Sequence, residues 1–322
     1  MENPAFIITI YLCDMGKFLH STISEEILND IIILISNRQN NSLRGFATKL
    51  NISTSHFKRI ITYLQSEKLI KNWNIVTNPN ILPKMKILLF FLKTNPNEPE
   101  VVNKLLENYS DQALSQLEGI TGNYSLVGQF HYIDTSHFLD SLEFLYSLAG
   151  KTGFQKYQLI EVIDVLKISG FCSSKITRSL RLGEHDKLQK IRNITSGAKM
   201  PLTSYQIAQQ LDISQPAIAK LLKKWKDENV ILGYSITTDY WKDHFIHAYI
   251  QLKAPLGKYQ IVIDYCIDRI EVQDVFRTNH EYSLLLRTRF PSLKDLNSFI
   301  KDIFQHSLVE DTITSIILDF LR

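Results

Sequence analysis

Two segments of this 322-residue chain carry polar and basic side chains at spacings that suit contact with a nucleic acid. The candidates are Ser53, Thr54, Ser55, His56, Lys58, Arg59 and Thr62 in the first segment, and Gln215, Lys220, Lys223 and Lys224 in the second. Such groups on one helix face can hydrogen-bond base edges and phosphate oxygens. The alternative is a solvated helix face without a partner. We expect both segments to contact double-stranded DNA. The second segment should discriminate less between base pairs, because Ala217 and Ala219 offer only methyl groups there.

The two segments lie in an internal repeat. Residues 42–77 align without a gap with residues 203–238, at an offset of 161 residues, which is half of the chain. Identical pairs include Ala47/Ala208, Leu50/Leu211, Ile52/Ile213, Ser53/Ser214, Glu67/Glu228, Ile70/Ile231 and Ile75/Ile236. A solenoid unit spans only roughly 20 to 50 residues, so the long offset indicates a duplicated domain.

Each copy has the residue pattern of a helix, a tight turn and a second helix. In the first copy Phe46, Ala47 and Leu50 are spaced for one helix face, and the small Ala47 lets a second helix cross closely. The Ser53 hydroxyl can then cap the next helix, as the Ser214 hydroxyl can in the second copy. The apolar positions of that helix, which we expect to be buried, are Phe57, Ile60, Ile61 and Leu64 in one copy and Ile218, Leu221, Leu222 and Trp225 in the other.

Strand signals follow each helix-turn-helix. Residues 69–75 and 230–236 predict the start of a two-stranded wing in each copy. Beyond the wing, each half shows the order β-α-β-β-α-β, the ferredoxin-like pattern. Its segments are 85–92, 100–109, 114–120, 124–132, 134–149 and 157–167, then 247–252, 259–268, 272–277, 282–290, 292–304 and 312–321. The predicted fold class is α+β: two winged helix-turn-helix domains alternate with two ferredoxin-like βαββαβ domains in a tandem duplication.

These patterns divide the chain into six segments. They are an N-terminal extension (1–23), a first winged helix-turn-helix (24–82), a first ferredoxin-like domain (83–168), a linker (169–183), a second winged helix-turn-helix (184–242) and a second ferredoxin-like domain (243–322).

A winged helix followed by a ferredoxin-like domain resembles the leucine-responsive and asparagine regulators of bacteria and archaea, the Lrp/AsnC family, here as a fused tandem. The segments that carry the resemblance most specifically are QIAQQLDIS (206–214), KWKDENVILGY (224–234) and the turn Thr121-Gly122-Asn123-Tyr124. Lys68 and Asn229 depart from the family, which usually has glycine there, and His280 replaces the glycine of the turn in the second half. The resemblance implies a sequence-specific transcription regulator.

The resemblance also implies a ligand and an assembly. In the family the glycine turn lies at the dimer interface where small effectors, often amino acids, bind. The implied effector-binding residues are therefore Thr121, Gly122, Asn123 and Tyr124. Family members dimerise by pairing two ferredoxin-like sheets, so this chain is expected to form an intramolecular pseudo-dimer. Assembly into a larger homo-oligomer stays open.

Composition excludes several other classes. The hydrophobic fraction of 44% suffices for real cores, and the net charge of +3 requires a DNA-binding protein to concentrate its cations on particular faces. The apolar run at 5–13 is followed by charged residues, and no segment reaches the ~20 apolar residues of a membrane span, so we expect a cytoplasmic protein.

The three cysteines are not spaced as metal ligands are, so we predict that they are buried thiols. We expect no catalytic residue and no cofactor, because the sequence has no GxSxG, HExxH or Cys-His arrangement. We expect no metal, because the two histidines of His244-x-x-His247 sit at a strand entry.

Two rival functions remain open. Some haem-precursor decarboxylases of the siroheme type resemble the same winged-helix and ferredoxin-like unit. Here His131, Tyr132, His280 and Arg289 could supply groups around a tetrapyrrole. The other rival is an interaction module that has lost contact with DNA.

Overall fold

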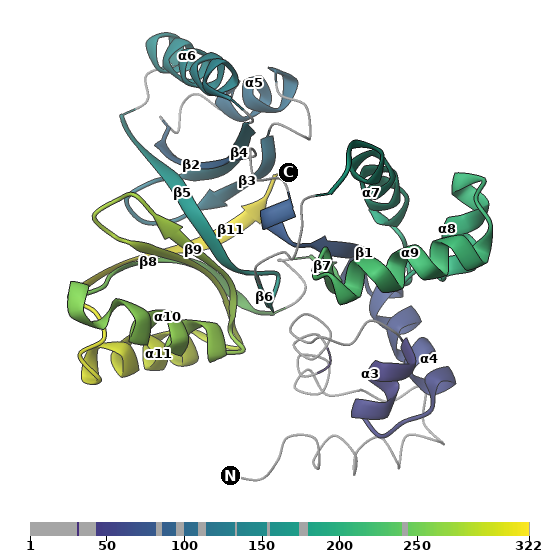
Figure 1. The fold of residues 1–322 in the computed structure, drawn as a ribbon. Helices are drawn as coiled ribbons and strands as arrows, with labels where there is room; N and C mark the ends of the chain where they lie inside the picture. Colours follow the sequence, from purple (N-terminus) through teal and green to yellow (C-terminus); the bar gives the residue numbers. More distant parts are fainter. Residues whose placement is uncertain are drawn as a thin grey trace. The chain divides into compact units, whose positions relative to one another are not determined.

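The computed structural model describes residue 31 and residues 43–81, 86–94, 100–108, 114–132, 134–152, 155–173, 180–239 and 244–321 (Figure 1). The predicted N-terminal extension at 1–23 and the middle of the predicted linker, 174–179, lie outside the described residues. The chain forms two compact units. We call them the helical unit (residues up to 81, with 169–244) and the sheet unit (82–168, with 245–322), and each combines parts of both sequence halves. No helix in the described ranges is long and apolar enough to span a membrane.

The helical unit contains the duplicated helix-turn-helix. Its elements are α3 (Leu43–Lys49), α4 (Thr54–Ser66), β1 (Ile70–Thr77), η2 (Pro79–Ile81), β6 (Phe171–Cys172), α7 (Leu182–Thr195), α8 (Ser204–Leu211), α9 (Gln215–Asp227) and β7 (Ile231–Thr238). The succession α3, α4, β1 repeats as α8, α9, β7, at the positions that the sequence alignment predicts. Asn51 and Asp212 take matching left-handed conformations in the two turns, with φ of 54° and 53°. The repeat in the sequence is therefore a repeat in the fold.

The wing differs from the prediction, because each copy contributes one strand to a shared ribbon. β1 pairs antiparallel with β7, with Trp73 opposite Ile236 and Ile75 opposite Tyr234. After β1 the chain turns at Pro79 and leads on to the next domain, so the described residues of that copy contain no returning strand. The backbone groups of β1 find their partners in the other copy instead. The backbone N–H of Trp73 donates instead to the Ala198 carbonyl, at 2.8 Å, so Trp73 also forms an isolated bridge with Ala198.

The backbone at the ends of α4 and α9 takes a conformation that favours glycine. Lys68 and Asn229 both have left-handed backbones, with φ of 60° and 56°. Glycine is favoured at such helix ends because it has no Cβ, and asparagine tolerates the conformation better than lysine does.

We expect Lys68→Gly to raise the free energy of unfolding of the helical unit by about 1 kcal/mol, because glycine relieves the left-handed strain. Asn229→Gly is the matched control and should raise it by only a few tenths of a kcal/mol. Urea denaturation followed by tryptophan fluorescence is the measurement, because the buried Trp73 and Trp225 both lie in this unit. An equal gain from both variants would show that strain at Lys68 is not the cause.

The sheet unit contains two ferredoxin-like halves. The first comprises β2 (Lys86–Lys93), α5 (Glu100–Asn108), β3 (Leu114–Ile120), β4 (Leu126–Tyr132), α6 (Thr135–Thr152) and β5 (Lys156–Ile168). The second comprises β8 (Ile246–Lys253), η3 (Leu256–Lys258), α10 (Tyr259–Asp268), β9 (Val272–Thr278), β10 (Leu284–Phe290), α11 (Leu293–Gln305) and β11 (Asp311–Phe320). This order confirms the predicted β-α-β-β-α-β pattern in both halves and, with the helical unit, the α+β fold.

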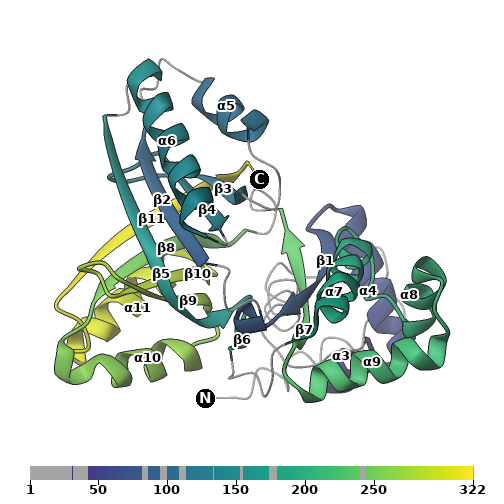
Figure 2. The ribbon, with the colours of Figure 1, turned by 45° about the horizontal axis from the view of Figure 1, so that its top comes forward.

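The two halves pair with each other through their last strands. The first part of β5 pairs with β2 of its own half, and its second part pairs with β9 of the other half. In the same way β11 pairs first with β8 and then with β3. The pairings therefore close into a ring in the order β2-β4-β3-β11-β8-β10-β9-β5-β2 (Figure 2). This arrangement is the expected intramolecular pseudo-dimer.

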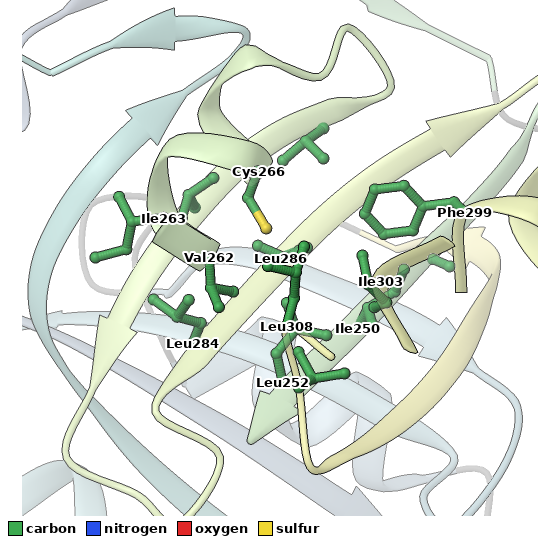
Figure 3. Close-up of a cluster of buried hydrophobic side chains, with 14 of the residues drawn as sticks. Ile250, Leu252, Val262, Ile263, Cys266, Leu284, Leu286, Phe299, Ile303 and Leu308 are labelled. Atoms are coloured by element: carbon green, nitrogen blue, oxygen red, sulfur yellow. The ribbon is translucent and has the colours of Figure 1, made fainter. Parts of the chain in front are cut away.

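Each half has its own apolar core beneath its helices. In the second half α10 and α11 lie side by side on the strands (Figures 1 and 2). Val262 and Cys266 of α10 and Phe299 of α11 point toward Leu284 and Leu286 (Figure 3). Burial raises the pKa of the Cys266 thiol to about 12, so this thiol stays protonated at neutral pH. The buried-thiol prediction holds for Cys266 and is wrong for Cys172, which is exposed because it ends the short strand β6.

A charged cluster joins the two halves of the sheet unit. It consists of Glu118 of β3, Tyr249 of β8, Asp274 of β9 and Arg287 of β10, and we call it the inner cluster. Arg287 forms ion pairs with Glu118 at 2.9 Å and with Asp274 at 3.6 Å. The Tyr249 hydroxyl donates to Glu118 Oε2 at 2.7 Å. Burial, reinforced by the Glu118 charge, holds the pKa of Tyr249 well above its ordinary value, so the phenol remains a donor.

Candidate nucleic-acid interface and ligand turns

The second helix of the first helix-turn-helix, α4, is fixed by its cap and its apolar stripe. The Ser53 hydroxyl accepts the N–H of His56 at 3.1 Å, which confirms the predicted cap. The helix buries the four predicted side chains, Phe57, Ile60, Ile61 and Leu64. Phe57 stacks on Phe46 of α3 with ring centroids 5.8 Å apart. The polar side of α4 is therefore held in one orientation.

That polar side offers two unengaged cations. The side chains of Lys58 and Arg59 are exposed and form no hydrogen bond or ion pair with any described residue. The hydroxyls nearby are partly engaged: Thr62 donates to the Lys58 carbonyl at 2.9 Å, and Ser53 and Ser55 share a hydrogen bond at 3.0 Å. Ser55 is exposed, and Thr54 and His56 are half-buried. The strongest free donors of this face are thus the Lys58 ammonium and the Arg59 guanidinium.

The corresponding helix of the second copy, α9, is built differently from the prediction. It buries Ile218 and Trp225, whereas Leu221 and Leu222 are only half-buried. Ser214 stands at the cap position, but its side chain forms no capping hydrogen bond. The N–H of Ala217 donates to the Ser214 carbonyl at 3.1 Å instead. Since Pro216 has no N–H, the first turn leaves little for a serine hydroxyl to accept.

The basic residues of α9 are not equivalent. Lys224 forms an ion pair with Glu184 of α7 at 3.0 Å, so it is partly diverted from any external partner. Lys220 and Lys223 are exposed and have no ion-pair partner among the described residues, and Gln215 is exposed at the start of the helix. The two helices therefore present different chemistry: mixed donors on α4, and lysines beside alanines on α9.

The turn of residues 121–124 lies between β3 and β4 and touches the other half of the sheet unit. The Thr121 N–H donates to the Ile316 carbonyl of β11 at 2.8 Å. Gly122 has φ of 107°, a conformation that L side chains rarely adopt, and a Cβ there would lie 3.6 Å from Ser315 Oγ. Thr121, Gly122 and Asn123 are exposed, whereas Tyr124 is buried with only 7% of its surface exposed. The accessible part of this turn is therefore 121–123.

The corresponding turn, 279–282, contacts the first half in the same manner. The Asn279 N–H donates to the Glu161 carbonyl of β5 at 3.2 Å, and Asn279 Oδ1 accepts the Glu161 N–H at 3.2 Å. The His280 ring stacks on Tyr282 and hydrogen-bonds the Gln158 amide at 3.2 Å. The second turn is thus occupied by its own side chains.

Glu161 and Ile316 accept the backbone N–H groups of the two turns, and the sequence pattern did not indicate these contacts. They are equivalent positions of β5 and β11, three residues before Asp164 and Asp319. The repeat could have paired them with each other, but nothing in the pattern shows which strand a turn will contact. Such cross-half contacts arise only when the ring of strands closes.

The four residues considered for a tetrapyrrole site contact different neighbours. His131 of β4 hydrogen-bonds Gln129 at 2.7 Å and lies 3.2 Å from the Ser115 hydroxyl. The other three have contacts elsewhere: the Tyr132 hydroxyl donates to Glu161, His280 meets Gln158, and Arg289 lies over the Phe245 ring.

Comparisons with known proteins agree with this architecture. Residues 247–321 match the Lrp/AsnC ligand binding domain family. The chain is 30% identical over 123 residues to an uncharacterised HTH-type transcriptional regulator of Pyrococcus furiosus, a match that covers 38% of this chain and 82% of that protein. It is 26% identical over 129 residues to the HTH-type transcriptional regulator FL11 of Pyrococcus abyssi, covering 40% of this chain and 84% of that protein.

A solved structure matches over nearly the whole length. The siroheme decarboxylase NirDL superposes with a TM-score of 0.56 at 14% identity, covering 93% of this chain and 92% of that chain. At this identity the likeness establishes the shared two-unit fold.

Proposed function

Since the chain belongs to the Lrp/AsnC family, we propose that it is a sequence-specific DNA-binding transcription regulator with two unlike reading helices. The observation that carries the proposal is the polar side of α4, where Lys58 and Arg59 are exposed without partners beside a capped and packed helix-turn-helix. The regulator names of the Pyrococcus relatives support it. Cations of this kind bind phosphates and guanine edges.

The preferred DNA site should be asymmetric, because one chain supplies both reading helices and their side chains differ. The β1–β7 ribbon holds the two copies together, so both helices meet the DNA in one binding event. Genome-wide footprinting should identify the site, and gel shifts should then compare it with two palindromes, each made from one half-site. We expect the natural site to bind more tightly than either palindrome. Equal binding to a palindrome would mean that the two helices read the same sequence, or that only one reads DNA.

We further propose that any small-metabolite effector, such as an amino acid, binds at the first turn, Thr121 to Tyr124. The first turn exposes its glycine backbone, whereas the second turn is filled by His280. Gly122→Trp should abolish the effect of the metabolite on DNA affinity, and His280→Ala should leave it unchanged. Because Gly122 has a left-handed backbone, Asn123→Ala serves as a second, unstrained variant and should weaken binding.

Calorimetric titration with the twenty amino acids is the measurement. Binding that survives Gly122→Trp and disappears with His280→Ala would reverse the assignment of the two turns. Absence of binding to any amino acid would leave control to another metabolite, to a protein partner or to the abundance of the regulator.

A second candidate function is a decarboxylase that acts on a siroheme-type tetrapyrrole. The observation in its favour is the fold likeness to NirDL, which spans both units at 93% coverage. His131 and Arg289 would be the first residues to test. Titration with siroheme, followed by its absorption spectrum, separates the two functions. A spectral shift that His131→Ala abolishes would favour the enzyme, and an unchanged spectrum would favour the regulator.

A further inference from the structure

The segment between α7 and α8, residues 196–200, belongs to the second copy of the repeat but lies against the first copy. Before it, α7 contacts β1 (Figures 1 and 2). The Ala198 carbonyl accepts the backbone N–H of Trp73 in β1 at 2.8 Å. The next carbonyl, that of Lys199, accepts the side-chain amide of Gln65 near the end of α4. Two consecutive carbonyls are thus held by the first copy, so the Lys199 backbone is fixed beside the last turn of α4.

Lys199 places an exposed cation at this point. Its side chain forms no hydrogen bond or ion pair with any described residue. The turn before it is open as well: Gly197 has φ of 83°, and a Cβ there would meet no atom within 4 Å. A large partner can therefore approach this segment without displacing a side chain.

Lys199 extends the polar side of α4 that carries the candidate DNA contacts. Lys58, Thr62 and Gln65 are spaced by four and three residues, so they follow one another along that side. An α-helix with its side chains is about 10–12 Å across, and the major groove of DNA is about 12 Å wide. A helix in the groove therefore fills it, and a group beside the helix faces the phosphates of a bordering strand. Lys199 is such a group.

The repeat gives an independent indication. At the offset of 161 residues Gln65 corresponds to Lys226 of α9, and Lys226 is exposed. In the second copy the cation at this position is part of the helix itself. In the first copy the position holds a neutral amide, which binds the Lys199 carbonyl. Both helices thus have a lysine at their last turn, but α4 receives its lysine from the other half of the chain.

We propose that Lys199 binds a DNA phosphate beside α4 and that Gln65 positions it there. The inference rests on the proposed function, because it requires α4 to lie in the major groove. A lysine ammonium is a compact charge with rotatable donors, which suits a phosphate better than a base edge. The contact therefore adds affinity for every DNA sequence and no discrimination between sequences.

Fluorescence anisotropy of the full-length chain, with the footprinted site and with a scrambled duplex at several salt concentrations, tests the proposal. Lys199→Gln should weaken binding to both duplexes by roughly fivefold and lower the slope of log affinity against log salt by about 0.9, the contribution of one phosphate. Lys199→Arg keeps the charge and should keep the slope. Lys294→Gln is the matched control, because Lys294 is an exposed lysine of α11 in the sheet unit. It removes the same net charge and should leave the slope unchanged.

Gln65→Ala tests the positioning role. It keeps every charge but releases the Lys199 carbonyl, so it should weaken binding to both duplexes by less than Lys199→Gln does. The double variant Gln65→Ala with Lys199→Gln should bind as Lys199→Gln does alone, because Gln65 acts through Lys199. Losses that add in the double variant would show that Gln65 does not position Lys199.

The outcomes separate this inference from the proposed function. If Lys199→Gln has the same salt slope as Lys294→Gln, while Lys58→Ala with Arg59→Ala loses the specific site, the regulator stands and the phosphate contact is overturned. If Lys199→Gln alters only the affinity for the specific site, Lys199 reads bases, and the proposal is likewise overturned. If the unmodified chain binds neither duplex, both the proposed function and this contact are wrong.

Discussion

Replacing Lys58 and Arg59 together by alanine should weaken binding to the specific DNA site by more than about 2 kcal/mol, or roughly thirtyfold. The reason is that both side chains are exposed on α4 and free of internal partners, so their whole donor capacity is available to bases and phosphates. Because neither contributes to the buried stripe of the helix, the fold should be retained. Fluorescence anisotropy with the footprinted site and with a scrambled sequence measures the specific and the non-specific affinity separately.

The matched control is the pair Lys220→Ala and Lys223→Ala on α9. These lysines stand beside alanines, and we expect them to contact phosphates more than base edges. Their loss should weaken binding to both DNA sequences alike and reduce the slope of log affinity against log salt by about two. If the α4 variant binds the specific site as the unmodified chain does, then α4 is not the reading helix. If the α9 variant alters only the specific affinity, α9 reads bases after all.

Replacing Arg287 by methionine should lower the free energy of unfolding of the sheet unit by about 3 kcal/mol or more, because it leaves buried carboxylates without their cation. The Glu118 side chain has no exposed surface, and Asp274 is buried beside it. The matched control is Lys253→Met, whose partner Glu281 lies 2.7 Å away at the surface. That change should cost at most about 1 kcal/mol, because exposed ion pairs are screened by water.

Amide hydrogen exchange of β8 and β10 is the measurement, because the described tryptophans lie in the helical unit and do not report on this one. The double variant Glu118→Gln with Arg287→Met should recover part of the loss, since the uncompensated charge is removed with its partner. A loss in Arg287→Met no larger than that in Lys253→Met would show that the inner cluster does not hold the halves together.

Local features of the fold followed from the sequence because they depend on residues that are close in the chain. Phe57, Ile60, Ile61 and Leu64 are spaced for one helix face, and the structure buries all four. The partner of a strand is a different matter. The alternation in β1 is the same whether β1 pairs with a neighbour or with β7, which lies on average some 160 residues away. The shared ribbon was therefore missed.

The site was predictable to the extent that a helix exposes its polar face. Lys58 and Arg59 belong to that face, and their exposure agrees with the expectation. The ion pair of Lys224 with Glu184 could not be foreseen, because it joins two helices whose packing no periodicity specifies. The inner cluster was missed for a similar reason. Glu118, Asp274 and Arg287 lie on three different strands among other polar residues, and only the closed ring of pairings brings them together.

Because both halves of the closed ring belong to one chain, each half can mutate independently of the other. In an assembly of two identical chains every substitution appears twice, so a buried acid on one side imposes a buried acid on the other. Here Glu118 of β3 corresponds to Phe276 of β9 in the repeat, and both are buried. The fused chain can thus place a charge opposite Arg287 on one side and an aromatic ring on the other. A single codon change alters one side of the ring, which leaves the opposite side free to keep its original role.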